Sequence, residues 1–164
     1  MLPEYFEFSL PTKLVYGVGV LSRINEAVSR FGKRKAMLVT GKILVKAGPV
    51  DKVISGFKGT NIKIVCTFDQ VPPNSTIQTV RECAALGTKY KCDMIVAVGG
   101  GSVIDTAKVA NLIIKKGGTL EDHMGAYLLD SSEELLPSIV IPTTAGTGSE
   151  VTKVAIIADT DKDV

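Results

Sequence analysis

The chain has 164 residues and a mass of 17.4 kDa, which is the size of one ordinary domain. Hydrophobic residues make up 45% of the sequence and charged residues 22%, proportions typical of a folded protein, so a disordered chain is excluded. The net charge is only +2, from 19 basic and 17 acidic side chains, and this argues against a nucleic-acid-binding or membrane-binding surface.

The N-terminal segment and the cysteines bear on where the protein resides. Residues 1–11 contain two glutamates and no basic start, which is not the pattern of a signal peptide. No apolar run approaches the roughly 18 to 20 residues that span a bilayer. Cys66, Cys83 and Cys92 are odd in number and show no CxxC spacing, so we interpret them as small core residues. A reducing cytoplasm fits this pattern best.

Apolar runs and stretches with helical spacing alternate along the chain. The runs predict strands at 13–17, 36–40, 62–68, 94–98 and 138–141, with a last strand-like run at 154–158. The helical spacings predict helices at 20–31, about 44–56, 76–90 and 102–116, the second interrupted by Gly48-Pro49 and the third capped by Asn74 or Ser75. Residues 119–136 are polar and irregular.

This alternation predicts an α/β fold with a Rossmann-like parallel sheet flanked by helices, its crossovers right-handed. In such sheets ligands bind beyond the carboxyl ends of the strands. The loops that follow the strands, at residues 41, 69–75, 99–102 and 142–150, are therefore the places where a site is expected.

The loop after the run at 94–98 is rich in glycine and reads Gly99-Gly100-Gly101-Ser102. Three consecutive glycines place no Cβ in the way of a ligand. Ser102 and Asp105 have the spacing of a capping box at the start of a helix. Because the N–H groups at a helix N-terminus bind phosphate, we favour a phosphate site over the alternative of a plain strand-to-helix turn.

The loop after the run at 138–141 has the sequence PTTAGTGSE, at residues 142–150. It concentrates small hydroxyls and flexible backbone, and such hydroxyls can bond ribose or phosphate oxygens. Taken alone it is equally well a polar loop. Its expected place on the same sheet edge as the glycine loop favours ligand binding.

Familiar catalytic motifs are missing from both loops. The dinucleotide fingerprint would need a glycine where Ile104 stands, and neither a P-loop nor a nucleophile elbow is present. His123 is the only histidine, so a histidine-based metal site cannot be built from this chain alone, and we interpret it as a surface residue. We therefore expect no catalytic residue and no metal ligand among these residues.

Two segments, GGGSVIDTAK at 99–108 and IPTTAGTGSEVT at 141–152, resemble the signature segments of the iron-containing alcohol dehydrogenase family. That family is related to glycerol dehydrogenase and dehydroquinate synthase. Weaker agreement comes from PTKLVYGVGVL near the start, the Val-Thr before residue 41, and VPPNST at 71–76. The resemblance spans essentially the whole chain.

The resemblance implies a role for each loop in binding NAD or NADP. The glycine loop would hold the cofactor pyrophosphate, the threonine loop would line the ribose and nicotinamide, and a residue of the VPPNST segment would lie near the adenosine. The residues so implied are Gly99, Gly100, Gly101 and Ser102 with Asp105 close by at the cap, then Thr143, Thr144 and Thr147, and Asn74.

The resemblance also implies a second domain. Full-length members of the family have a helical domain whose aspartate and histidines bind Fe²⁺ or Zn²⁺, and the metal polarises an alcohol oxygen while hydride passes to the nicotinamide. We therefore expect residues 1–164 to be the NAD(P)-binding domain, inactive without a C-terminal domain, and we expect the metal ligands beyond Val164. The parent enzyme would act on a small alcohol or aldehyde and assemble as a homo-oligomer.

One departure from the family pattern concerns the choice of cofactor. Many members have an aspartate after the Val-Thr strand end, where this chain has Gly41 followed by Lys42. A carboxylate repels a 2′-phosphate, whereas a glycine leaves room for it and a lysine attracts it. We hypothesise that the parent accepts NADP(H); the alternative is that Gly41 is only a turn residue and Lys42 points to solvent.

Other functions remain open at this point. A dehydroquinate-synthase-like or glycerol-dehydrogenase-like enzyme would use the same nucleotide half, although PTTAGTGSEVT fits the alcohol branch better. A stand-alone nucleotide-binding module without chemistry is the third possibility.

Overall fold

A computed structural model describes residues 12–32, 34–125 and 134–160 of the protein. Four parallel strands form one sheet in the order β2-β1-β3-β4. The strands are β1 (Arg34–Val39), β2 (Ile62–Phe68), β3 (Met94–Gly99) and β4 (Ser138–Pro142). The N-terminal segment 1–11, the middle of the polar stretch at 126–133, and residues 161–164 with the terminal Val164 lie outside the described residues.

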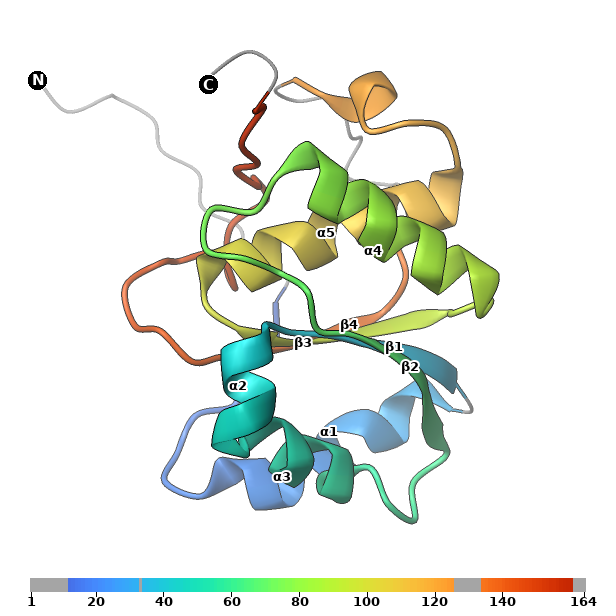
Figure 1. The fold of residues 1–164 in the computed structure, drawn as a ribbon. Helices are drawn as coiled ribbons and strands as arrows, with labels where there is room; N and C mark the ends of the chain where they lie inside the picture. The colour runs from blue at the N-terminus through green and yellow to red at the C-terminus, as the bar shows by residue number, and fades with distance from the viewer. Residues whose placement is uncertain (1–11, 33, 126–133, 161–164) are drawn as a thin grey trace, which may run out of the picture.

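Helices cover both faces of the sheet (Figure 1). One face carries α1 (Ile24–Val28), α2 (Lys42–Ala47) and α3 (Pro49–Gly56), with the 3₁₀ turns η1 (Val20–Arg23) and η2 (Ser29–Phe31) on either side of α1. The other face carries α4 (Ile77–Lys89) and α5 (Gly101–Lys116), after which the 3₁₀ turn η3 (Glu121–His123) follows. The predicted α/β class with a parallel sheet is confirmed.

The strand order explains why the helices divide between the faces. The chain moves outward from β1 to β2, then returns across β1 to β3 and continues to β4. Right-handed crossovers in opposite directions place their helices on opposite faces. The direction reverses between β1 and β3, and the crevice outside such a reversal is the usual ligand site of this kind of sheet.

The two central strands are buried on both faces. Successive side chains of a strand point to opposite sides, so Met37 and Ile95 pack with α4 and α5, whereas Leu38 and Val96 pack with α1 and α3. All four of these side chains are almost completely buried. The continuous apolar runs in β1 and β3 therefore have the composition expected for strands covered by helices on both sides.

The structure corrects several sequence-based expectations about individual elements. Residues 13–17 form no strand, and their apolar side chains are largely exposed. The run 154–158 joins no strand of the sheet, and its single β-bridge is between Ala158 and Thr76. The helix predicted at 44–56 is two helices, because Gly48 adopts a left-handed φ of 91° that ends α2 before Pro49 begins α3.

The cap of α4 also differs from the prediction. Thr76, not Asn74 or Ser75, is the N-cap, and its side-chain oxygen accepts a hydrogen bond from Thr79 N at 3.3 Å. The helix thus begins at Ile77, one residue later than expected, which leaves Asn74 and Ser75 in the loop. Within the described residues, no helix combines the length and apolarity needed to cross a membrane.

Cys83 and Cys92 are buried in the core between the sheet and its α4 face, as the interpretation of the cysteines as core residues predicts, and Cys66 packs against this core but is only partly buried. They form no disulfide, and Cys66 Sγ lies 3.6 Å from Cys92 Sγ. Burial raises the pKa of Cys66 and of Cys83, and it raises the pKa of Cys92 to about 12. The folded protein therefore favours neutral thiols.

The raised thiol pKa values predict a loss of stability in alkali. Thiols in the unfolded chain ionise at about pH 8.5, whereas the buried thiols of the folded chain stay neutral to higher pH. The contribution of the buried thiols to the free energy of unfolding is therefore complete below about pH 8.5, and it declines as the pH rises towards the folded-state pKa. Urea unfolding at a series of pH values should show this decline, and it should be shallower in Cys83→Ala, which removes one of the buried groups. Parallel declines in both proteins would contradict the prediction.

Candidate nucleotide-binding site

The carboxyl ends of all four strands meet at one edge of the sheet, and the predicted site residues follow these ends. Gly41 and Lys42 follow β1, Asn74 lies in the loop after β2, the glycine loop and Asp105 follow β3, and the three threonines follow β4.

Hydrogen bonds tie these strand ends to one another. Thr40 Oγ1 donates to the Val98 carbonyl at 2.8 Å, which joins the ends of β1 and β3. Thr143 N donates to the Gly99 carbonyl at 3.0 Å, which joins the ends of β3 and β4. The sequence-predicted loops are therefore assembled side by side.

Helix α5 begins at Gly101, and its N-cap is Gly100, which offers no side chain to cap the helix. The first main-chain bond of the helix runs from Ile104 N to the Gly100 carbonyl at 3.1 Å. The N–H groups of residues 101 to 103 consequently have no acceptor within the helix. Together with the positive end of the helix dipole, they form an arrangement suited to a phosphate group.

The expected capping box at Ser102 and Asp105 is wrong. Ser102 already lies inside the helix, and its side-chain oxygen accepts from Asn74 N at 3.2 Å. The Asp105 carboxylate is directed elsewhere and accepts a hydrogen bond from Ile156 N. The helix begins at Gly101 with Gly100 as its N-cap, two residues earlier than a Ser102 cap would place it.

The glycine loop packs closely against its neighbours, so a side chain on one of its glycines would need a neighbouring group to move. A Cβ on Gly100 would lie 2.8 Å from Thr144 Oγ1, and one on Gly101 would lie 3.3 Å from Ser149 Oγ. A Cβ on Gly99 would lie 2.5 Å from the side chain of Val103. The glycine and threonine loops are therefore in contact, and the space between them suits backbone and small hydroxyls.

The threonine loop exposes its hydroxyls and turns on two glycines. Thr143, Thr144 and Thr147 are all exposed, and Gly146 and Gly148 adopt left-handed φ values of 91° and 67°. Such values favour glycine and turn the loop back towards α5. The hydroxyls that the sequence predicts as ribose contacts are thus accessible to a ligand at the sheet edge.

Asp105 and Lys108 connect α5 to the segment after the threonine loop. Lys108 Nζ donates to the Val154 carbonyl at 2.7 Å and to Thr152 Oγ1 at 3.2 Å, and it lies 3.4 Å from Asp105 Oδ1. Asp105 Oδ2 accepts from Ile156 N at 3.1 Å. Asp105 is buried, and its carboxylate is occupied by these protein groups. Its predicted place near the cofactor stays a prediction.

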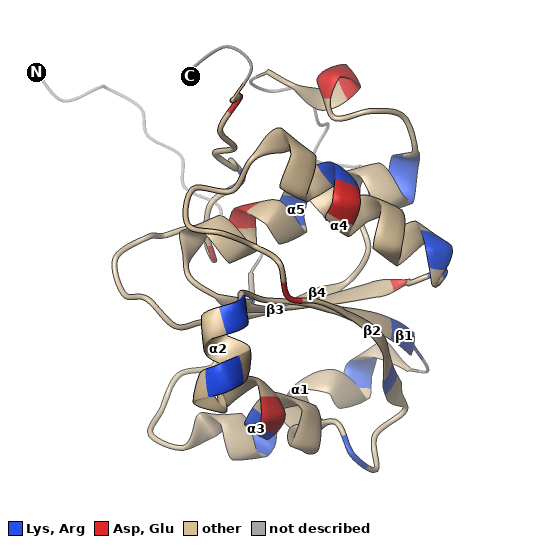
Figure 2. Ribbon diagram, viewed as in Figure 1, with Lys and Arg blue, Asp and Glu red and all other residues tan. Residues whose placement is uncertain are grey.

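Gly41 and Lys42 mark the end of β1. Gly41 is the N-cap of α2 in an extended conformation with φ −111°, which any residue adopts. A Cβ there would lie 3.0 Å from the Val71 carbonyl, a close contact. Lys42 is exposed on the first turn of α2, one of the positively charged segments in Figure 2.

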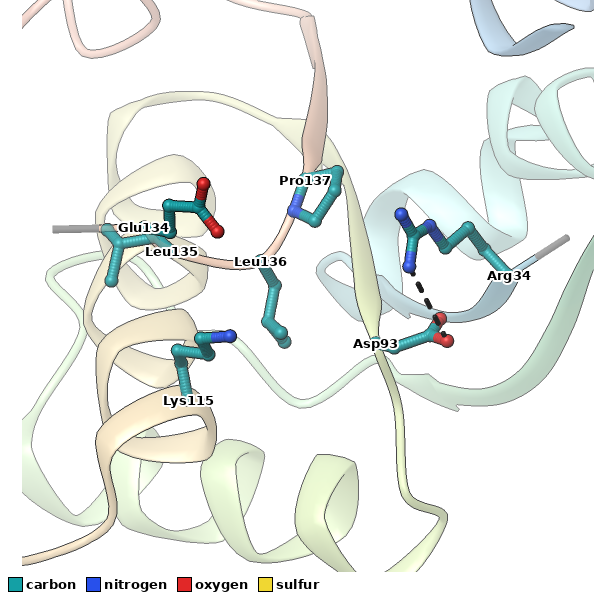
Figure 3. A pocket seen from close by; sticks show the side chains of 7 residues that line it. All are labelled: Arg34, Asp93, Lys115, Glu134, Leu135, Leu136 and Pro137. Carbon is teal, nitrogen blue, oxygen red and sulfur yellow. Dashed lines mark ion pairs between the residues drawn. The ribbon is translucent and has the colours of Figure 1, made fainter. Parts of the chain in front are cut away.

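A hollow in the described surface lies at the opposite end of the sheet, away from the carboxyl ends of the strands (Figure 3). It has a volume of about 420 Å³ and is close to where β1, β3 and β4 begin. Asp93 in this hollow accepts a hydrogen bond from the backbone N–H of Lys35 at 2.7 Å and lies 4.0 Å from Arg34 Nη1. The lining residues are Arg34, Asp93, Lys115, Glu134, Leu135, Leu136 and Pro137. It contains none of the predicted site residues.

The described residues do not fit a metal ion. No group of three or more histidine, cysteine, aspartate or glutamate side chains comes together in the described part of the chain. The ring of His123 lies on η3, where Nε2 is 3.1 Å from the Gly117 carbonyl. Val164 itself lies outside the described residues, so the expectation of metal ligands beyond it stays a prediction.

Sequence reasoning missed three residues that hold the site together: Ser75, Thr106 and Lys108. Ser75 and Thr106 are buried hydroxyl residues in contact with each other, and Lys108 bonds the segment after the threonine loop. Helical periodicity gave one usable signal, because Thr106 is four residues after Ser102 and so lies on the same face of α5.

The model of the family described as iron-containing alcohol dehydrogenase matches residues 11–164. The chain belongs to this family. A choline dehydrogenase of Bacillus subtilis (strain 168) is 38% identical over 163 residues, which cover 99% of this chain and 40% of that relative. The family resemblance inferred from the two signature loops is therefore confirmed.

Solved structures of the iron-containing alcohol dehydrogenase type have the same fold. A 1,3-propanediol oxidoreductase superposes with a TM-score of 0.88 at 34% identity, covering 98% of this chain and 41% of the other. A sulfoacetaldehyde reductase from Bifidobacterium kashiwanohense, solved in complex with NAD⁺, gives a TM-score of 0.84 at 28% identity, covering 99% of this chain and 42% of the other. The chain thus spans about two fifths of the length of such relatives.

Proposed function

We propose that this chain is the NAD(P)-binding domain of a metal-dependent alcohol dehydrogenase. The observation that carries the proposal is the N-terminus of α5, where the N–H groups of residues 101 to 103 have no acceptor within the helix and no capping side chain covers them. The pyrophosphate would bind there, and Thr143, Thr144 and Thr147 would bond the ribose. Asn74 would lie towards the adenosine.

We propose that the whole enzyme transfers hydride between a small alcohol or aldehyde and the nicotinamide. The cofactor would supply the hydride chemistry, and this domain would bind and orient it. The described residues do not fit the metal, so a second helical domain, beyond Val164, would supply the Fe²⁺ or Zn²⁺ ligands. The named relatives support this reading, among them the 1,3-propanediol oxidoreductase and the choline dehydrogenase.

One measurement tests nucleotide binding by this chain, and a second tests the activity of the full-length enzyme. Fluorescence titration of this chain with NADH should show saturable binding that ADP displaces. The full-length enzyme should oxidise short-chain alcohols or diols with NAD⁺ or NADP⁺, and added Fe²⁺ or Zn²⁺ should restore activity after chelation. A chain that binds NADH inside an enzyme inactive on all alcohols would favour the stand-alone nucleotide-binding module or a dehydroquinate-synthase-like lyase.

The cofactor preference gives a third prediction. Since Lys42 is exposed beside the end of β1 and no carboxylate follows that strand, we propose that NADP(H) is accepted. Lys42→Ala should weaken NADPH binding severalfold and leave NADH binding nearly unchanged, because only NADPH carries the 2′-phosphate. Lys46→Ala, further along α2, is the matched control. Equal NADPH affinity in wild type and Lys42→Ala would remove the proposed role of Lys42.

Gly41→Asp is a less direct test of the same idea. Its Cβ would meet the Val71 carbonyl at 3.0 Å, so the loop after β2 must move slightly to admit the side chain. We expect the new carboxylate to weaken NADPH binding more than NADH binding.

The cytoplasmic location and the homo-oligomeric state stay predictions. The first comes from the cysteine pattern and the second from the family resemblance.

A further inference from the structure

Two buried hydroxyls join α5 to the loop before α4. Thr106 is 0% exposed and Ser75 is 2% exposed. Their hydroxyl oxygens lie 2.5 Å apart, and Thr106 Oγ1 is also 2.7 Å from the Ser102 carbonyl. Thr106 Oγ1 is the donor toward both neighbours, the Ser75 hydroxyl oxygen and the Ser102 carbonyl, so its single proton is shared between these two acceptors.

The same loop reaches Ser102 through its backbone. Asn74 adopts a left-handed φ of 55°, which asparagine tolerates better than most residues, and its N–H donates to Ser102 Oγ at 3.2 Å. The Ser75 carbonyl in turn accepts from Ala158 N at 2.9 Å. The loop is thus fixed from two sides by buried or main-chain groups.

These contacts determine what the Ser102 hydroxyl can do. A hydroxyl carries one proton and two lone pairs, and the Asn74 N–H occupies one of the lone pairs. The proton of Ser102 can then be directed to an acceptor beside the N–H groups of the first turn of α5. An anion bound at that turn would receive a hydroxyl donor in addition to the backbone donors.

We infer that Thr106 and Ser75 are positioning residues, which hold the Asn74 loop against α5 so that the Ser102 hydroxyl donates to a bound phosphate. This inference rests on the proposed nucleotide site and adds two residues that do not touch the nucleotide themselves. Thr106 acts through both Ser75 and the Ser102 carbonyl, so its hydroxyl is the group whose removal is most informative.

The test is calorimetric titration of the chain with ADP. Thr106→Val keeps the size of the side chain and removes the hydroxyl, and it should weaken ADP binding about tenfold, roughly the effect of one lost hydrogen bond. Thr106→Ser restores the hydroxyl and should bind ADP nearly as wild type does. Thr60→Val removes a bonded threonine hydroxyl far from the site and should leave ADP affinity unchanged.

A double-mutant cycle separates positioning from a general loss of structure. In a Ser102→Ala background, Thr106→Val should weaken ADP binding no further, because the hydroxyl that it orients is gone. Should Thr106→Val fail to fold, Ser75→Ala replaces it in the same cycle. Unchanged ADP affinity in Thr106→Val, or fully additive effects in the cycle, would overturn the positioning role of Thr106 and Ser75 and leave the proposed nucleotide site in place. A wild-type chain that binds neither ADP nor NADH would overturn the proposed function with it.

Discussion

Replacing Gly100 with valine is expected to lower the affinity for NADH by about a hundredfold while the fold is kept. The backbone at Gly100 has φ −84° and ψ −167°, a conformation that valine adopts without strain. Its side chain would instead occupy the space between the glycine loop and Thr144, where even a Cβ lies 2.8 Å from the threonine oxygen. A ligand would lose its approach to one or two charge-assisted N–H donors, each worth roughly 1.5–3 kcal/mol.

A second glycine provides the control for this experiment. A Cβ on Gly87, in α4, would lie 2.4 Å from the Ile114 side chain, away from the candidate site. Gly87→Ala should therefore lower the melting temperature and leave NADH affinity unchanged. Gly100→Val should lower NADH affinity and change the melting temperature less, because the exposed Thr144 side chain can move away from the new side chain. Wild-type affinity for NADH in a folded Gly100→Val protein would show that the pyrophosphate does not bind at the start of α5.

The second large effect is expected on stability, from Asp105→Ala. This change removes a buried acceptor from Ile156 N and the carboxylate beside Lys108. A hydrogen bond to a charged group contributes about 1.5–3 kcal/mol, so the free energy of unfolding should fall by roughly 2–3 kcal/mol. Urea unfolding followed by circular dichroism measures this fall, and amide exchange at Ile156 should become faster.

Conservative and surface variants sharpen the interpretation. Asp105→Asn retains one acceptor oxygen, for Ile156 N, and replaces the oxygen beside Lys108 with an NH2 group, so it should be less destabilising than Asp105→Ala. Glu26→Ala breaks the exposed pair with Arg23 and should change stability little, because exposed ion pairs are screened by water. If Asp105→Ala were as stable as Glu26→Ala, the carboxylate would not hold residues 152–156.

Much of the fold could be predicted from the sequence, because the strongest signals came from buried elements. The apolar runs in β1 and β3 are buried on both faces, and both strands form where they were expected. The segments 13–17 and 154–158 have similar composition but do not join the sheet. Local pattern could not separate these cases, since a strand forms only where a hydrogen-bonding partner lies beside it.

The candidate site was predicted at the level of loops but not of contacts. The glycine and threonine loops meet at the expected sheet edge, because parallel strands bring their carboxyl ends together. The sequence could not show that Asp105 bonds Ile156, because those residues are 51 positions apart and spacing rules describe only local neighbours. A local motif suggested the capping box, and a distant backbone N–H took its carboxylate instead.

The arrangement around Asp105 and Lys108 has a consequence for assembly. These side chains hold the backbone at Val154 and Ile156, while the two apolar side chains are 66% and 81% exposed. Because this backbone is already ordered, it would lose little conformational entropy when another protein surface packs against the two side chains. Asp105 and Lys108 lie on α5, which begins at the glycine loop. A docked surface and a bound nucleotide would therefore both contact elements that are joined through α5.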